Sequence, residues 1–511
     1  MTSLPHSRSR ARARPRSAAA VSAAMACIAT LASCSAVGPD FVRPDVDAAA
    51  DWSQRHGGSP ELSAPPTSTA TLPADRWAVF GDAELLHLQT IASTANQDVR
   101  TAALRVMQSR MDEATVSAQR GLQVQGHGGI TRQRQSESGS SARLVNLIGG
   151  TDKQTLLDAL SAPFTLYQAG FDASWEPDLW GRVLRSEEAA KANTDEQRAA
   201  LQQARLSVEA ELARSYFSMR AAQRQQQLLR AELAAARETA QLLDAQLRGG
   251  LADESAVSRQ RAQVASLESM LPAAQSQEAL AMNQITLLCG MTPGALNAEL
   301  ASDGASSDSS PLPDLRFGLT SDLARRRPDI EAAEARLHAA TAGIGIAVAD
   351  LYPRITLGAS FGLESVASSK FGDWGSRQWS AGPSLSIPVF DQGRRRATIV
   401  LRQLQQQEAA VAYQQVVLKA WHEVDDSISS YVAETQRANR VAERLRLSES
   451  DADLAQARFA NGLTTFLPVL SASTELLDAK RDLSDSRSRE QTALVAIYKS
   501  LGYGEASNGR P

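Results

Sequence analysis

Residues 394–463 read RRRATIVLRQLQQQEAA…DADLAQARFANGL and decide the fold. The stretch Arg394–Ala460 contains no proline and is dense in Ala, Gln, Glu, Arg and Leu, which all favour helix. At a rise of about 1.5 Å per residue, one helix over this stretch would be roughly 100 Å long, far longer than a globular core requires. Asn461-Gly462 then supplies a residue that tolerates the left-handed conformation and ends a helix. A second helical run returns from Leu467 toward Tyr498, so the sequence predicts a very long helical hairpin.

The first half of the chain repeats this pattern at a constant offset. Arg182–Arg248 is a stretch of the same length, also without proline, and it ends in Gly249-Gly250-Leu251. Matched positions keep an offset of 212 over this part, as for Gly250 and Gly462, and an offset of 231 over the part that precedes it. A fixed spacing over such a length indicates an internal duplication. Because the offsets differ by 19, the first copy carries an insertion of that size between about Leu122 and Phe171.

The N-terminus carries the marks of export. Residues 1–33 combine five arginines with a short apolar run, as in a secretory signal peptide, and the run is too short for a permanent membrane helix. Leu31-Ala32-Ser33-Cys34 resembles a bacterial lipoprotein box, which implies an acylated Cys34 as the mature N-terminus. An ordinary cleavage site with a chance cysteine is the alternative. Ser35 follows where an aspartate would favour the inner membrane, so the resemblance implies the outer membrane.

The rest of the composition bounds the domain organisation. Residues 34–74 are rich in Pro, Ala, Ser and Asp and are expected to form a lipidated tether. We place repeat 1 at 75–300, a linker at 301–320, repeat 2 at 321–503 and a C-terminal tail at 504–511. A formal net charge of −4 gives no indication of nucleic-acid binding. After processing, Cys289 has no partner for a disulfide and is expected to be a small buried hydrophobic residue.

Four segments alternate apolar and polar residues with period two, which predicts strands. Each is about ten residues long, the length that crosses an outer membrane when tilted. Polar loops join them in pairs, at Arg132–Pro163 and about Glu364–Arg377, and the first holds the insertion. The alternating residues are Leu122, Val124, Gly126, Gly128 and Ile130; Phe171, Ala173 and Trp175; Ile355, Leu357, Ala359, Phe361 and Leu363; and Leu385, Ile387 and Val389.

Four strands cannot close a barrel, and an open sheet edge would leave unpaired backbone groups in lipid. Several chains must therefore share one barrel, and three chains would supply twelve strands. The long helices are too polar to cross a membrane and too long for one core. The sequence thus predicts an α+β membrane protein, a trimeric twelve-stranded β-barrel continued by a long periplasmic α-helical barrel.

Five ordered groups of residues covering essentially the mature chain resemble an outer-membrane factor of the TolC/OprM type, in the lipoprotein branch called the NodT family. The resemblance implies a homotrimeric exit duct in the outer membrane, without cofactor or catalysis, that works with a periplasmic adaptor and an inner-membrane RND-type pump. The groups are Cys34 with Val37-Gly38-Pro39-Asp40-Phe41 and Pro44; Trp77, Phe80, Asp82 and Leu85; Arg326-Arg327-Pro328-Asp329-Ile330 with Ala333-Glu334, Leu337 and Ala340; Tyr352-Pro353-Arg354 with Gly382-Pro383, Leu385, Pro388, Phe390-Asp391 and Gly393-Arg394; and Arg458-Phe459, Gly462-Leu463, Leu467, Val469 and Leu470.

The resemblance also implies two sites near the periplasmic end. An adaptor-contact surface would comprise Arg458, Gly462, Leu463, Leu467, Val469 and Leu470 with Gly250 and Leu251; alternatively, Gly462 only caps a helix and the leucines form the hairpin core. Threefold rings of Asp451 and Asp453 would narrow the periplasmic aperture; alternatively, these carboxylates and Glu449 form a solvated helix face. Some family members place an aspartate six residues after the turn glycine as a lock, but this chain has Ala256 and Pro468 there. The lock is therefore not carried over.

Other functions have less support. We find no nucleophile elbow, Walker loop or zinc-helix motif, so no catalytic, cofactor or metal residue is assigned and the protein is not expected to be an enzyme. Histidines 56, 87, 127, 338 and 422 share no metal-ligand spacing. Arg326-Arg327-Pro328-Asp329 suits a helix start, which favours a structural role. Export of small toxic compounds or drugs is the favoured function; the alternatives are the exit duct of type I protein secretion and a non-channel periplasmic coiled-coil scaffold lipoprotein.

Overall fold

The computed structural model describes residues 36–44, 56–63, 77–139, 153–250, 253–301 and 327–502. The signal peptide, Cys34 and Leu251 lie outside these ranges. The chain divides into two compact units: one contains residues 1–42, 110–192 and 338–407, and the other contains 43–109, 193–337 and 408–511. Each unit draws segments from both predicted repeats, so compact packing does not follow the repeat boundaries.

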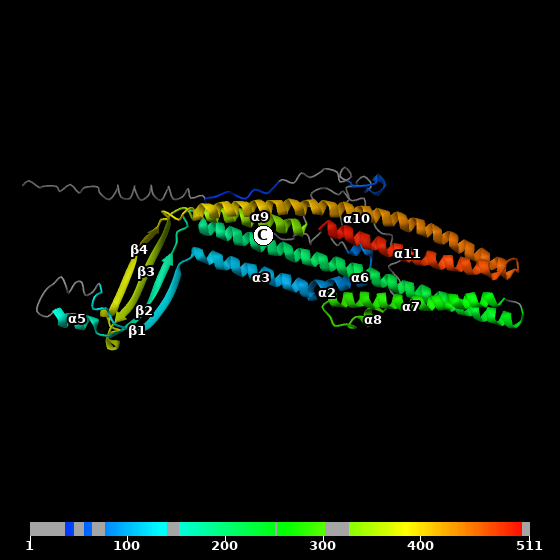
Figure 1. The fold of residues 1–511 in the computed structure, drawn as a ribbon, viewed down its shortest axis with the longest axis horizontal. Helices are drawn as coiled ribbons and strands as arrows, with labels where there is room; N and C mark the ends of the chain where they lie inside the picture. The colour runs from blue at the N-terminus through cyan, green and yellow to red at the C-terminus, as the bar shows by residue number, and fades with distance from the viewer. Residues whose placement is uncertain are drawn as a thin grey trace, which may run out of the picture. The chain divides into compact units, whose positions relative to one another are not determined.

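The first unit contains one antiparallel sheet in the order β1-β2-β3-β4 (Figure 1). Its strands are β1 (Gln123–Gln133), β2 (Phe164–Trp175), β3 (Arg354–Ser365) and β4 (Arg377–Ser386). The period-two pattern predicted four strands, but it placed Ile387 and Val389 in the last one, whereas β4 ends at Ser386, opposite the first residue of β3. The loop between β1 and β2 spans 134–163 and holds α5 (Lys153–Ser161), whereas the loop between β3 and β4 spans only 366–376. The first loop is therefore the longer one, and its excess length equals the difference between the two sequence offsets.

The strand register gives the sheet two chemically different faces. Phe171 lies opposite Phe361, which lies opposite Trp379, so large apolar side chains share one face. Gln168 lies opposite Glu364 on the other face and donates a hydrogen bond of 2.7 Å to its carboxylate. The apolar side chains are exposed, including Phe171 and Trp379. The two faces thus suit lipid on one side and water on the other.

The two longest helices have the predicted ends. Helix α6 spans Arg182–Arg248 and α10 spans Arg394–Ala460, each 67 residues. Helices α7 (Glu254–Leu288) and α11 (Phe466–Ser500) return beside them, each 35 residues. The shorter helices are α2 (Ala83–Ala95), α3 (Gln97–Ser117), α8 (Asn297–Leu300) and α9 (Pro328–Ala349). Among the described residues, no helix combines the length and the apolar character needed to cross a membrane.

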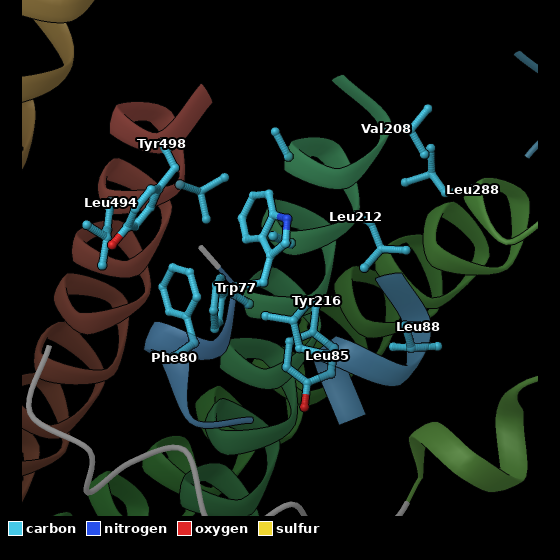
Figure 2. Close-up of a cluster of buried hydrophobic side chains, with 14 of the residues drawn as sticks. Trp77, Phe80, Leu85, Leu88, Val208, Leu212, Tyr216, Leu288, Leu494 and Tyr498 are labelled. Atoms are coloured by element: carbon cyan, nitrogen blue, oxygen red, sulfur yellow. The ribbon is translucent and has the colours of Figure 1, made fainter. Parts of the chain in front are cut away.

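The second unit has a core built around the first folded motif of the chain. Trp77 and Phe80 pack with Tyr498 of α11 (Figure 2). The ring centroids of Phe80 and Phe217 of α6 lie 4.8 Å apart. Asp82 caps α2 and also accepts a 2.7 Å hydrogen bond from the hydroxyl of Tyr216. Cys289 is fully buried in this core, as predicted. This motif therefore joins helices from both halves of the chain.

Candidate functional site

The turn between α10 and α11 ends the long helix as predicted. Gly462 has a φ of +69°, which places it in the left-handed region. The amide of Leu463 donates to the carbonyl of Arg458 at 2.9 Å, and the amide of Gly462 donates to the carbonyl of Phe459 at 2.9 Å. These two bonds form a Schellman cap, in which glycine avoids the strain that a Cβ would bring.

The predicted contact residues at this turn divide into two groups. Leu463 is 76% exposed and Leu467 is 49% exposed, and Arg458 is also exposed. Val469 is only 6% exposed and packs with Ala455 and Ala472 inside the hairpin, while Leu470 is half-buried. Val469 therefore belongs to the hairpin core, which corrects its assignment to the contact surface. The exposed apolar surface at this turn comes from Leu463 and Leu467.

The turn after α6 is built in a related way. Gly250 has a φ of +70° and its amide donates to the carbonyl of Leu247 at 3.0 Å. Asp253 caps α7 by accepting from the amide of Ser255 at 3.2 Å and from the Ser255 hydroxyl at 2.5 Å. This carboxylate is committed to its own turn, so the structure gives it no role as a lock between helices.

The predicted aperture carboxylates lie on one helix without forming a pair. Asp451 and Asp453 are both exposed. Because an α-helix turns about 100° per residue, two residues two positions apart point about 200° apart. Glu449 and Asp453 are four positions apart and share a face. At most one of Asp451 and Asp453 can therefore point toward a common axis.

A cross-helix ion pair that was not predicted from the sequence lies in the same hairpin. Arg444 of α10 contacts Glu475 at 2.7 Å and Asp482 at 2.6 Å, both on α11. The two carboxylates are seven positions apart, so they lie on one face two turns apart. Their spacing in the sequence does not indicate that both contact the same arginine. All three side chains are exposed, so these ion pairs add little to stability.

Two histidines at partly buried positions each contact a single acidic side chain. His56 lies 2.8 Å from Asp425, and His338 lies 2.8 Å from Glu188. No group of three or more His, Cys, Asp or Glu side chains placed to hold a metal ion occurs within the described ranges.

A strap of residues 36–42 follows the predicted lipidation position and is held by buried groups of the first unit. Arg185 of α6, whose side chain is 6% exposed, donates to the carbonyl of Val37 at 3.3 Å and contacts Asp40 at 2.6 Å. Phe41 stacks on His338 with ring centroids 4.3 Å apart. Gly38 has a φ of +95°, and a Cβ there would fall 2.5 Å from the Cα of Gly345. The strap therefore needs glycine at this point.

Glu188 of α6 lies between Arg185 of the same helix and His338 of α9. Arg185 also contacts Glu188 at 2.8 Å. Burial disfavours the ionised carboxylate, but hydrogen bonds from Arg185 and His338 outweigh it and lower the pKa of Glu188. The strap residues were singled out from the sequence but Arg185 was not, because nothing local distinguishes a buried arginine in the first turn of a polar helix from an exposed one.

Replacing Arg185 by methionine is expected to release the strap. Methionine removes the donors to Val37 and Asp40 and leaves Glu188 without its arginine, a loss of about 1.5–3 kcal/mol of local stability. Hydrogen exchange of the Val37 amide, which donates to the carbonyl of Trp180 at 3.1 Å, should then accelerate by tenfold or more in rough terms. R198M is the matched control, because Arg198 lies on the same helix with an exposed i−3 partner, Asp195. Equal exchange rates in the two variants would contradict the role of Arg185.

The chain is similar to known proteins in both sequence and structure. The sequence description of the family "Outer membrane efflux protein" matches residues 90–291 and 319–503. The outer membrane protein OprJ of Pseudomonas aeruginosa is 32% identical over 489 residues, which cover 93% of this chain and 94% of OprJ. The probable outer membrane lipoprotein SilC of Salmonella typhimurium is 26% identical over 476 residues, which cover 93% of this chain and 96% of SilC. The solved structure of the outer-membrane channel OprN is similar with a TM-score of 0.77 at 29% identity, covering 92% of this chain and 99% of that one.

Proposed function

The chain belongs to the outer membrane efflux protein family, and on that premise we propose that it is the homotrimeric exit duct of a tripartite efflux system for small toxic compounds or drugs. A periplasmic adaptor and an inner-membrane RND-type pump would deliver these compounds. Members of this family are outer-membrane channels and not enzymes. The fold class is that of the trimeric channels, with four strands per chain in a twelve-stranded barrel that continues as a periplasmic helical barrel.

The four-stranded sheet is the observation that carries the proposal. Within the described residues, β1 and β4 each pair with one neighbour only, so two edges are open. Open edges cannot remain in lipid, because their amides and carbonyls would lack partners. The exposed apolar face and the polar face support closure with lipid outside and water inside. If three copies join edge to edge, every edge strand gains a partner, and the apolar face meets lipid while the polar face meets water.

The helical turns support a docking role at the periplasmic end. Leu463 and Leu467 expose apolar side chains beside the exposed Arg458, which is a suitable surface for an apolar helical partner. We assign adaptor contact to these residues with Gly462, Leu470, Gly250 and Leu251. The exit duct of a tripartite system must bind an adaptor, whereas a scaffold lipoprotein needs no partner at these turns.

Lipidation of Cys34 would complete the attachment to the outer membrane. The strap that Arg185 holds begins two residues after this cysteine, so an acyl chain there would be tied to the strand-containing unit. Labelled palmitate should enter the wild-type protein and not the Cys34→Ser variant. Equal labelling of the two proteins would contradict lipidation at Cys34.

The aperture proposal is tested by single-channel conductance of the purified protein in planar bilayers. Neutralising the inward carboxylate should raise conductance about twofold or more, because a threefold ring of charge and its bound cations would be lost. D453N and D451N should not both have this effect, since the two side chains point about 200° apart. Unchanged conductance in both variants would place the aperture elsewhere.

Deletion of the gene tests the export function. Cells that lack the protein should lose several-fold of their tolerance to small toxic compounds, and the wild-type gene should restore it. Unchanged tolerance over a broad panel of compounds would contradict efflux. Loss of a secreted protein from the medium would instead support the type I secretion alternative.

A further inference from the structure

A polar cavity of about 310 Å³ lies where β3 and β4 meet the start of α10. It belongs to the first unit and is separate from both helical turns. Its charged lining consists of Arg354, Arg394 and Arg395 with a single carboxylate, Asp350, and Tyr352 and Ser386 add hydroxyl groups. Three guanidinium groups and one carboxylate give the lining an excess of positive charge, which suits an anionic ligand.

Two of the three arginines have acidic partners. Arg354 contacts Asp350 at 2.6 Å, and Arg395 contacts Asp391 at 2.8 Å. The side chain of Arg394 is exposed and has no ion pair or hydrogen bond within the described part of the chain. One guanidinium per chain is therefore available to a ligand, with two more beside it.

The start of α10 is not itself the binding group. Asp391 accepts from the amide of Gly393 at 3.1 Å and from the amide of Arg395 at 3.3 Å. These bonds satisfy amides that would otherwise attract an anion at a helix N-terminus. Any anion in the cavity must therefore bind the arginine side chains.

The strand register places the cavity on the polar side of the sheet. Arg354 lies opposite Ser386, in the same alternation as the pairs Thr356–Ser384 and Ser360–Ser380. The neighbouring pair Ile355–Leu385 belongs to the apolar face. An occupant on the polar side meets water and not acyl chains, so a solute is favoured over a lipid headgroup.

We propose that this cavity is a subsite for the oxyanion group of a transported solute, a carboxylate or a phosphate, with Arg394 as its main ligand and Arg354 and Arg395 beside it. A guanidinium group binds such oxyanions with two parallel N–H donors. The inference rests on the proposed channel, because a threefold assembly would repeat the cavity three times around the lumen. It adds a preference for anionic groups at the point where strands give way to helices.

Direct binding tests the subsite without relying on conduction. Citrate is titrated into the purified full-length mature protein in uncharged detergent and the heat is measured. We expect R394Q to weaken citrate binding by about fivefold or more, since its charge-assisted donors are lost. R396Q is the matched control: Arg396 is an exposed neighbour on the same helix, outside the cavity lining, and its replacement changes the net charge equally.

Each outcome decides the proposal. Equal weakening by R394Q and R396Q, or no binding to the wild type, would overturn it. Loss of citrate binding when phosphatidylglycerol is added to the detergent would also overturn it, by reassigning the cavity to lipid headgroups. Binding that depends on Arg394 in a protein that fails to conduct would support the subsite and contradict the channel, so the two proposals fail separately.

Discussion

Replacing Arg327 by methionine is expected to destabilise the helical unit by about 3 kcal/mol. The Arg327 side chain is 6% exposed and lies among three acceptors. It makes a two-pronged contact with Asp329 at 3.0 and 2.8 Å, donates to Glu423 at 2.6 Å, and donates to the carbonyl of Ser500 at 2.7 Å. Burial alone would lower the pKa of Arg327, but its hydrogen bonds to Asp329 and Glu423 raise it. The guanidinium is thus held charged at the meeting point of α9, α10 and α11.

The substitution removes the arginine from all three acceptors, which is why the expected loss is large. Within the described residues, Asp329 keeps only the amide of Ile330 at 3.0 Å, and Glu423 keeps only Lys419 at 3.7 Å. A buried carbonyl without a partner costs about 1–3 kcal/mol, and the two carboxylates would be left close to each other. Both carboxylates are partly exposed, which keeps the total near the lower end of the range for a broken buried pair. Gly502 also packs directly on Arg327, because a Cβ there would meet the arginine side chain.

Thermal unfolding followed by circular dichroism measures this effect. R327M should lower the midpoint by several degrees, roughly 2–4 °C per kcal/mol for a unit of this size. R336M is the control, because Arg336 lies on the same helix and pairs with Glu196 while its side chain is 67% exposed. R327K should fall between them, since lysine keeps the charge but cannot donate as a planar fork. Equal midpoints for R327M and R336M would show that the contact is dispensable.

Local patterns were sufficient for the elements of the fold. The absence of proline throughout both long stretches and the glycines at 250 and 462 set the ends of the long helices. Alternation of period two predicted that four strands exist, because a strand between lipid and water must expose opposite chemistry on opposite faces. It misplaced the last one, since Ile387 and Val389 lie beyond the end of β4 at Ser386. The change in the offset also located the enlarged loop, because comparing the two repeats does not require the conformation of the loop.

Local patterns were insufficient for contacts between distant segments. The start of α9 was predicted from Pro328 and Asp329, yet the partner of Arg327 is a carbonyl 173 positions away. Arg185 was missed for the same reason. Val469 was misassigned because an apolar residue near a turn can face the hairpin or the solvent, and only packing decides. Asp451 and Asp453 remain separate candidates for the aperture, because helix geometry points them about 200° apart.

Changing Leu463 and Leu467 together to aspartate is expected to abolish efflux while the trimer stays intact. Both side chains are exposed, so the change should cost the isolated protein little stability. At an apolar interface, however, each buried carboxylate would lose its hydration without gaining a partner, which costs several kcal/mol in rough terms. That cost lowers affinity for an adaptor by about a hundredfold or more. Cells should then be as sensitive to toxic compounds as the deletion strain.

Three measurements separate loss of docking from loss of structure. The double variant should migrate as the same heat-stable oligomer as the wild type, conduct like it in planar bilayers, and fail to retain the adaptor on purification. L463M is the control for the turn, because methionine keeps apolar contact and should keep efflux. Efflux that persists in the double aspartate variant would show that this turn is not required for docking. The adaptor surface would then have to centre on the turn at Gly250, where Leu251 follows in the equivalent position to Leu463, and the same substitution made there would decide between the two turns.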